Sequence, residues 1–185
     1  MKKLILIIIV LAIIGGAGYV FLGKSGIKLD LEKKTDTTIT PTIGAVETGA
    51  LVGKTYTNSV YKFSVELPEG YSAREITGGE AESRSIVFEN EKSDGVQIVI
   101  TPYDDIKVLT ADMIKNDIPD MKIDQVQTVD IGQNYKGVAF LGDNAEFGGA
   151  SRDVWFVFKG NLYQISTYAR LDTTLQAIFS TWKFF

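Results

Sequence analysis

The sequence contains no histidine and no cysteine, so catalysis would have to depend on Ser and Lys, on paired carboxylates or on Tyr. Those two absences remove the commonest general base, the commonest transition-metal ligand and the most reactive thiol nucleophile. Asp104 and Asp105 follow a predicted strand, where two carboxylates can act as an acid–base pair or bind a divalent cation. Asp143 and Glu146 offer oxygen ligands at close spacing, which hard cations prefer.

Each of these candidates also has a simpler interpretation, which we favour. Adjacent residues of a strand point to opposite faces, so Asp104 and Asp105 are more simply solvated carboxylates ahead of a helix. Residues 143–146 lack the Asp-x-Asp-x-Asp-Gly spacing of an EF-hand loop. No serine lies in a Gly-x-Ser-x-Gly motif. We therefore expect a protein with no catalytic residue and no cofactor, and keep a carboxylate-dependent, metal-assisted hydrolase as an alternative.

The charge of the chain is divided between a basic N-terminal part and an acidic remainder. The whole chain has 19 Lys and Arg against 23 Asp and Glu. Residues 35–185 hold 13 of those basic and 21 of those acidic residues, a net charge of 13 − 21 = −8. Nucleic-acid binding depends on clustered Lys and Arg that neutralise phosphates, so we expect no nucleic-acid partner.

Residues 4–22 are apolar and uncharged, and they follow Lys2 and Lys3. A helix of this length would extend roughly 28 Å, about the thickness of the hydrocarbon core of a bilayer. We expect residues 1–23 to be an uncleaved signal anchor, with the N-terminus cytoplasmic and the rest extracytoplasmic. A cleaved signal peptide is the alternative, because Gly15 to Gly18 supply small residues for cleavage and the protein would then be secreted.

Residues 24–55 are rich in Thr, Gly and Lys and show neither helical nor strand periodicity. Such a segment has few side chains that could fill a core, and we expect a flexible tether. A coil of about 30 residues spans roughly 30 Å, enough to hold a domain clear of the lipid headgroups. Residues 56–185 are then the folded domain.

The domain shows the patterns of an antiparallel sheet with two helices. Alternation predicts strands over residues 60–67, 72–76, 84–89, 96–101, 123–131, 135–141, 154–158 and 162–166. Residues 91–95 carry an Asp-Gly signal for a hairpin turn, residues 142–150 are expected to form a glycine-rich loop, and Gly160-Asn161 suits a type II′ turn. The pattern of strands and helices predicts the α+β class, an antiparallel sheet covered by helices.

Two segments change to helical spacing. The first runs from Ile106 towards Pro119, with Thr110 or Asp112 as the candidate N-cap. The second lies close to the C-terminus, where Leu171, Leu175, Ile178 and Trp182 recur on one face. Asp172 or Thr173 is its candidate cap, and Thr173 with Gln176 matches a capping box. We expect the apolar end of the chain, residues 183–185, to be docked on the domain.

The two ends of the domain carry a family resemblance. Residues 56–71, YTNSVYKFSVELPEGY, combine an aromatic-rich first strand with a Pro-x-Gly-aromatic turn, and residues 160–166, GNLYQIS, precede a final helix and a terminal STWKF. These stretches resemble the opening and the ending of PsbP-like domains. The resemblance implies an antiparallel sheet sandwiched by helices. It transfers no functional residue, because the matched positions are core and turn residues.

The family implied by this resemblance includes an extrinsic subunit of the photosystem II oxygen-evolving complex, a Ran-binding nuclear transport factor and many exported bacterial proteins. What these proteins share is a binding role and no common catalytic residue. We therefore expect a bacterial, membrane-tethered, extracytoplasmic, non-catalytic accessory module that binds another envelope or membrane protein. A binder of a small apolar ligand or lipid, in a pocket between sheet and helix, is the alternative from a different class.

Overall fold

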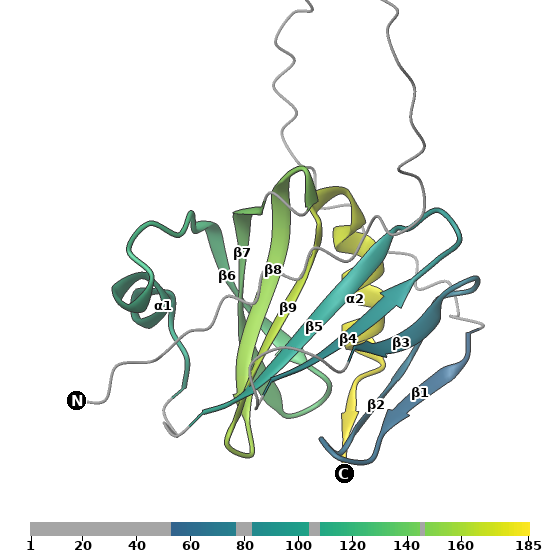
Figure 1. The fold of residues 1–185 in the computed structure, drawn as a ribbon. Helices are drawn as coiled ribbons and strands as arrows, with labels where there is room; N and C mark the ends of the chain where they lie inside the picture. The colour runs from purple at the N-terminus through teal and green to yellow at the C-terminus, as the bar shows by residue number, and fades with distance from the viewer. Residues whose placement is uncertain (1–52, 77–82, 104–107, 145–146) are drawn as a thin grey trace, which may run out of the picture. The chain divides into compact units, whose positions relative to one another are not determined.

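The computed structural model describes residues 53–76, 83–103, 108–144 and 147–185 (Figure 1). The predicted anchor, residues 1–23, and the tether up to residue 52 lie outside these ranges. Within them, neither helix is long and apolar enough to cross a membrane. The structural account below therefore concerns the domain alone.

A seven-stranded antiparallel sheet forms most of the domain, with the spatial order β3-β4-β5-β9-β8-β7-β6. Its central strands are the longest and the most apolar, whereas the edge strands β3 and β6 are largely exposed. In chain order the strands are β3 (Ser72–Ile76), β4 (Arg84–Glu89), β5 (Gly95–Pro102), β6 (Asp124–Ile131), β7 (Tyr135–Asn144), β8 (Gly149–Phe158) and β9 (Asn161–Tyr168).

A second, three-stranded sheet joins the two ends of the domain. It contains β1 (Thr55–Asn58), β2 (Phe63–Glu66) and β10 (Lys183–Phe184), with β2 in the centre and both pairings antiparallel. The phenol of Tyr56 donates a 2.6 Å hydrogen bond to Glu75 Oε1, which links this sheet to the edge strand β3. The expectation that the C-terminal residues dock on the domain is confirmed by β10.

The large sheet is buried on both faces, as its neighbouring residues Trp155 and Phe156 show. Successive residues of a strand point to opposite faces, yet Trp155 is 4% exposed and Phe156 is 1% exposed. Trp155 belongs to a core with α1 (Ala111–Asp117), and Phe156 to a core with α2 (Asp172–Ser180) and the small sheet. The predicted α+β class, an antiparallel sheet with two short helices, is confirmed.

The two helices begin in different ways. At α1 the Thr110 hydroxyl accepts a hydrogen bond from the main-chain N–H of Met113, so the predicted Thr110 cap is confirmed. At α2 the predicted capping box of Thr173 and Gln176 is wrong. A 3₁₀ turn, η2 (Ala169–Leu171), continues directly into α2, and no side-chain cap forms. The Asp172 carboxylate instead accepts hydrogen bonds from Arg152 and Gln176.

Three predicted strand boundaries are also wrong. The strand predicted over residues 60–67 is shorter, because residues 59–62 form the turn between β1 and β2, with φ +57° at Lys62, and only Phe63–Glu66 is strand. The loop predicted over residues 142–150 is largely strand, since β7 continues to Asn144 and β8 begins at Gly149. Phe158 pairs with Asn161, so the turn residues are Lys159 and Gly160, both with positive φ, as in a type I′ turn.

Candidate functional site

Of the four carboxylates proposed as metal ligands, the structure describes only Asp143. Asp143 is exposed near the end of β7, opposite Ala150 of β8. Asp104, Asp105 and Glu146 lie outside the described residues. Among the residues that are described, no group of three or more His, Cys, Asp or Glu side chains could hold a metal ion.

The aromatic residues of the β8–β9 hairpin are divided between the two cores. Phe156 stacks on Tyr163 with ring centroids 4.7 Å apart, beneath α2. Trp155 meets Phe140 edge to face on the α1 side, with centroids 5.7 Å apart. Both faces of this hairpin are therefore packed, and its aromatic rings offer no binding surface.

Sequence reasoning missed a buried carboxylate in β8. Asp153 is 4% exposed and accepts hydrogen bonds from Ser151 Oγ, at 2.6 Å, and from Ser166 Oγ, at 2.5 Å. Burial raises the pKa of Asp153, and the two hydroxyl donors partly offset that rise. With both hydroxyls donating to the carboxylate, the group is satisfied within the sheet. We interpret this arrangement as structural, because Asp153 and Ser151 are both buried within the sheet.

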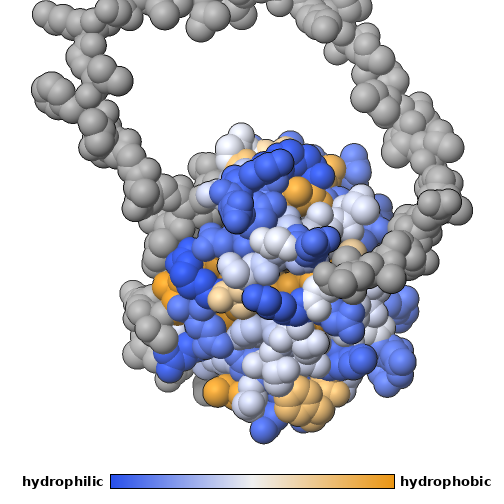
Figure 2. All heavy atoms as spheres, turned by 90° about the vertical axis from the view of Figure 1, so that its right-hand side faces the viewer, coloured by the Kyte–Doolittle hydropathy of each residue, from blue (hydrophilic) through white to orange (hydrophobic). Residues whose placement is uncertain are grey.

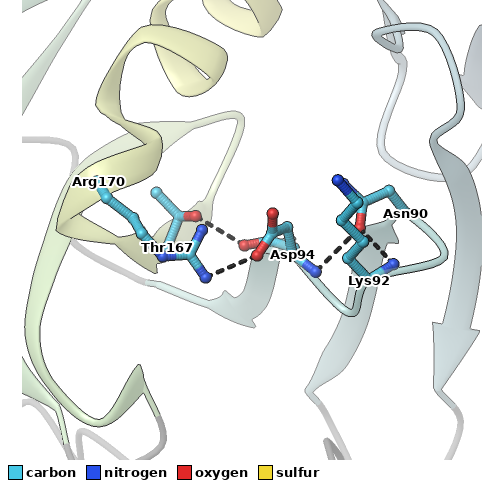
Figure 3. A network of polar contacts seen from close by, with 6 residues as sticks. Asn90, Lys92, Asp94, Thr167 and Arg170 are labelled. Atoms are coloured by element: carbon cyan, nitrogen blue, oxygen red, sulfur yellow. Dashed lines mark hydrogen bonds and ion pairs between the residues drawn. The ribbon is translucent and has the colours of Figure 1, made fainter.

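A hydrogen-bonded network holds the β4–β5 hairpin against the start of η2 (Figure 3). Asn90 Oδ1 accepts from the main-chain N–H groups of Lys92 and Asp94, at 2.9 and 3.1 Å. Arg170 Nη2 donates to Asp94 Oδ1 at 2.6 Å, and the Thr167 hydroxyl donates to the main-chain oxygen of Gly95 at 2.7 Å. The network therefore holds the hairpin in two ways: by hydrogen bonds within it, to Asn90, and by hydrogen bonds to it, from Thr167 and Arg170.

The electrostatics of this network follow from the pairing of Arg170 with Asp94. The hydrogen bond from Arg170 lowers the pKa of the Asp94 carboxyl, and the same bond raises the pKa of Arg170. The guanidinium also lies over the ring of Tyr168, 4.5 Å from its centroid. Burial, followed by the nearby Asp94 charge, raises the pKa of Tyr71. Positive and negative charges are thus held in fixed positions at this end of the sheet.

A cleft of about 590 Å³ lies beside the hairpin. Three separate stretches of chain line it: the residues before β1, the β2–β3 turn and the β4–β5 hairpin. The surface on this side of the domain is largely hydrophilic (Figure 2). The lining residues are Gly53, Lys54, Pro68, Glu69, Gly70, Tyr71, Ser72, Glu89, Asn90, Glu91 and Ser93.

The lining of the cleft suits the binding of a polar or cationic group. Glu69 and Glu91 are exposed, whereas Glu89 is bound to Arg74 Nε at 3.1 Å. The cleft therefore contributes two unpaired carboxylates beside the ring of Tyr71 and a single amine, that of Lys54. No sequence motif indicated this site, because its residues come together only when the β2–β3 turn and the β4–β5 hairpin lie at the same end of the domain.

Comparisons with known proteins identify the fold. No family model matches the sequence, and no curated protein matches it. Among solved structures, the domain is similar to the solution structure of cyanobacterial PsbP (CyanoP) from Synechocystis sp. PCC 6803, with a TM-score of 0.51. The two chains are 10% identical, and the match covers 77% of this chain and 99% of that one. The expectation of a PsbP-like α+β fold is confirmed.

Proposed function

We propose that this protein is a non-catalytic binding or accessory module, tethered to the membrane by residues 4–22 and exposing its domain on the extracytoplasmic side. The observation that carries the proposal is the cleft beside the Asp94–Arg170 ion pair. Its walls are fixed by hydrogen bonds, and a preorganised surface loses less conformational entropy when a partner binds. Its side chains offer charge and hydrogen bonding, and no nucleophile paired with a base.

The partner that this cleft suits is a protein segment with a Lys or Arg side chain. Two exposed carboxylates, Glu69 and Glu91, attract a cation, and the ring of Tyr71 can contact its aliphatic part. A membrane-tethered domain meets other envelope or membrane proteins most often, since the tether confines it to their surface. We therefore propose an envelope or membrane protein as the partner.

Binding of a small apolar ligand is less well supported by this cleft. Its lining is mostly polar or charged, whereas pockets for apolar ligands are lined mainly by aliphatic and aromatic side chains. The space between the large sheet and α2 is filled by packed rings, including those of Tyr163 and Trp182. The protein-binding role is the one that both observations favour.

The proposal is tested by capture of partners from detergent-solubilised membranes with the full-length tagged protein. The cleft variant is Glu69→Lys with Glu91→Lys. Its control, Asp117→Lys with Asp120→Lys, changes the net charge equally on exposed residues beside α1. Intact-mass analysis of the captured bait reports whether residues 4–22 are retained.

We expect wild type and control to retain the same membrane protein, and the cleft variant to lose it. Capture of that protein by all three baits would contradict binding at the cleft. A wild-type bait that retains no protein above an empty-tag control would contradict the binding role. A bait whose mass shows loss of residues 4–22 would contradict the tether.

A further inference from the structure

The end of the domain opposite the cleft combines exposed lysines with exposed apolar side chains. We call this end the basic tip and define it as residues 59–62, 132–136, 159–160 and 183–185. The strands place these segments together: Phe63 and Phe184 are partners in the small sheet, and Pro102 at the far end of β5 pairs with Asn161. In Figure 1 they gather at the lower end of the domain, beside the C-terminus.

Side-chain contacts join the segments of the basic tip into one surface. Lys62 Nζ lies 5.9 Å from the centroid of the Phe185 ring, and Phe185 N–H donates to the main-chain oxygen of Lys62 at 3.0 Å. Lys159 Nζ lies 5.2 Å from the Phe158 centroid. The ring of Tyr135 meets Phe158 edge to face, with centroids 4.8 Å apart. Two lysines of the basic tip, Lys62 and Lys159, thus lie close to aromatic rings.

The apolar groups of the basic tip are accessible to solvent. Of the five exposed large hydrophobic residues in the described chain, three belong to it: Val60 is 79% exposed, Phe185 55% and Tyr135 37%. Figure 2 shows apolar surface at the lower end of the domain, next to hydrophilic surface. Single exposed apolar residues are ordinary in soluble proteins, but a group of three among lysines is a surface of distinct chemistry.

The charge of the basic tip is opposite to that of the domain. Its segments contain Lys62, Lys136, Lys159 and Lys183 and no Asp or Glu, although residues 35–185 carry a net charge of 13 − 21 = −8. Lys136 is bound to Asp130, and Lys159 Nζ donates a hydrogen bond to the main-chain oxygen of Phe185 at 3.5 Å. No carboxylate side chain of the described residues forms an ion pair with the other three lysines. Asp104 and Asp105 are outside those residues.

We propose that the basic tip docks on a membrane surface of anionic lipids. Lysine ammonium groups bind lipid phosphates, while their methylene chains and the neighbouring Val60 and Phe185 side chains enter the boundary between headgroups and acyl chains. A protein partner with an acidic surface would not explain the three exposed apolar side chains as simply. This inference rests on the membrane tether of the proposed function.

Docking through the basic tip gives the domain one orientation. The cleft lies at the other end of β2 and β5, so it faces away from the lipid and towards a partner. The described chain begins at Gly53, which lines the cleft, and a coil of about 30 residues spans roughly 30 Å. When extended, that many residues reach up to about 100 Å, so the length of residues 24–52 permits this orientation of the domain.

The test uses the full chain, reconstituted in vesicles of phosphatidylcholine alone or with phosphatidylglycerol in a roughly two to one ratio. Because the sequence has no cysteine, a single nitroxide label can be attached at Gln133→Cys in the basic tip or at Lys92→Cys near the cleft. Collision of the label with a water-soluble nickel chelate reports docking. Vesicle flotation reports membrane association separately.

We expect the label at position 133 to become shielded in the anionic vesicles only, and the label at position 92 to stay accessible in both. Lys62→Glu with Lys159→Glu should lower the ratio of docked to undocked domain by at least about tenfold, because two attractive contacts become repulsive. The control, Lys115→Glu with Lys122→Glu, has the same net charge and should dock as wild type does.

Equal accessibility at position 133 in both kinds of vesicle, with the chain still floating, would overturn docking and leave the tether intact. An equal loss of docking in the two double variants would also overturn it, because net charge alone would then explain the effect. A chain that floats with neither kind of vesicle would overturn the tether and the docking together. Flotation with anionic vesicles alone would support docking and overturn the tether.

Discussion

The indole of Trp182 lies nearly parallel to the ring of Phe63, with centroids 4.5 Å apart and an interplanar angle of 14°. Trp182 follows α2, and Phe63 begins β2 near the other end of the domain. Both side chains are almost completely buried. This contact therefore joins β2, near the start of the domain, to the residue that precedes β10 at its end.

The first prediction concerns removal of the Trp182 side chain from this contact. Trp182→Ala should lower the free energy of unfolding by about 3–5 kcal/mol, because it leaves a large cavity that the neighbouring rings cannot fill. For a domain of this size that is a fall in melting temperature of roughly 10–20 °C. Thermal unfolding followed by circular dichroism measures it. Phe185→Ala, at a 55% exposed ring, is the control and should melt close to wild type.

A second prediction concerns Gly132, in the turn between β6 and β7. Its φ of +59° is unfavourable for other residues, and a Cβ atom there would lie 2.3 Å from the main-chain oxygen of Trp182. Gly70 has a similar φ of +79° and no atom within 4 Å of a built Cβ. Gly70→Ala should therefore show only the conformational cost of about 1–2 kcal/mol.

Gly132→Ala should be clearly more destabilising than Gly70→Ala, since a main-chain atom must also move. The difference between the two free energies of unfolding, measured in urea, reports how closely the β6–β7 turn packs on the end of α2. Equal values for the two variants would show that this turn can shift with no loss of free energy of unfolding. The close approach of Gly132 to the main-chain oxygen of Trp182 would then not contribute to stability.

Sequence patterns predicted those parts of the fold that depend on local periodicity. The β8–β9 hairpin and the helix carrying Leu175 and Ile178 are amphipathic or strongly apolar, so their existence followed from spacing. The start of α2 did not follow. Whether Thr173 caps a helix depends on how the chain enters it, and here the η2 turn already provides the first hydrogen bonds.

The candidate site could not be predicted, because it depends on pairing between distant segments. Glu69, Glu91 and Lys54 are ordinary charged residues in turns, and only the strand order places them around one cleft. Asp153 is a different case. An Asp directly before the apolar run of residues 154–158 in the same strand indicates a buried polar group, but its partner Ser166 is identified only by the β8–β9 register.

The third prediction follows from the raised pKa of Asp153. Because the pKa of Asp153 is higher in the folded state, the folded state holds this proton more tightly than the unfolded chain does. Its contribution to stability is full below the ordinary pKa of 3.8 and is lost as the pH rises through the folded-state pKa. Asp153→Asn should therefore become more stable relative to wild type as the pH increases over that range.

Urea unfolding at a series of pH values measures this difference. Ser166→Ala is the companion variant, because it removes one of the two hydroxyl donors to the carboxylate. It should raise the pKa of Asp153 further and cost about 1.5–3 kcal/mol where the carboxylate is charged. A constant difference between wild type and Asp153→Asn at every pH would show that Asp153 does not change its protonation on folding.

The fourth prediction concerns Asp94, whose pKa is lowered mainly by its hydrogen bond from Arg170. A lowered folded-state pKa favours the fold above the unfolded pKa, and this contribution is lost as the pH falls through the folded-state pKa. Arg170→Gln should return the titration of Asp94 towards 3.8, as followed by carboxyl-carbon NMR. Lys92→Gln, which removes a lesser cause of the shift, should move the titration less.

The same variant connects the ion pair to the cleft. If Arg170 fixes the β4–β5 hairpin through Asp94, its removal should increase amide hydrogen exchange in residues 90–94, which form one wall of the cleft. It should also weaken capture of the partner without any change to the residues that line the cleft. A variant with a shifted Asp94 titration but unchanged exchange and capture would show that Asn90 alone holds the hairpin, through its own hydrogen bonds to Lys92 and Asp94.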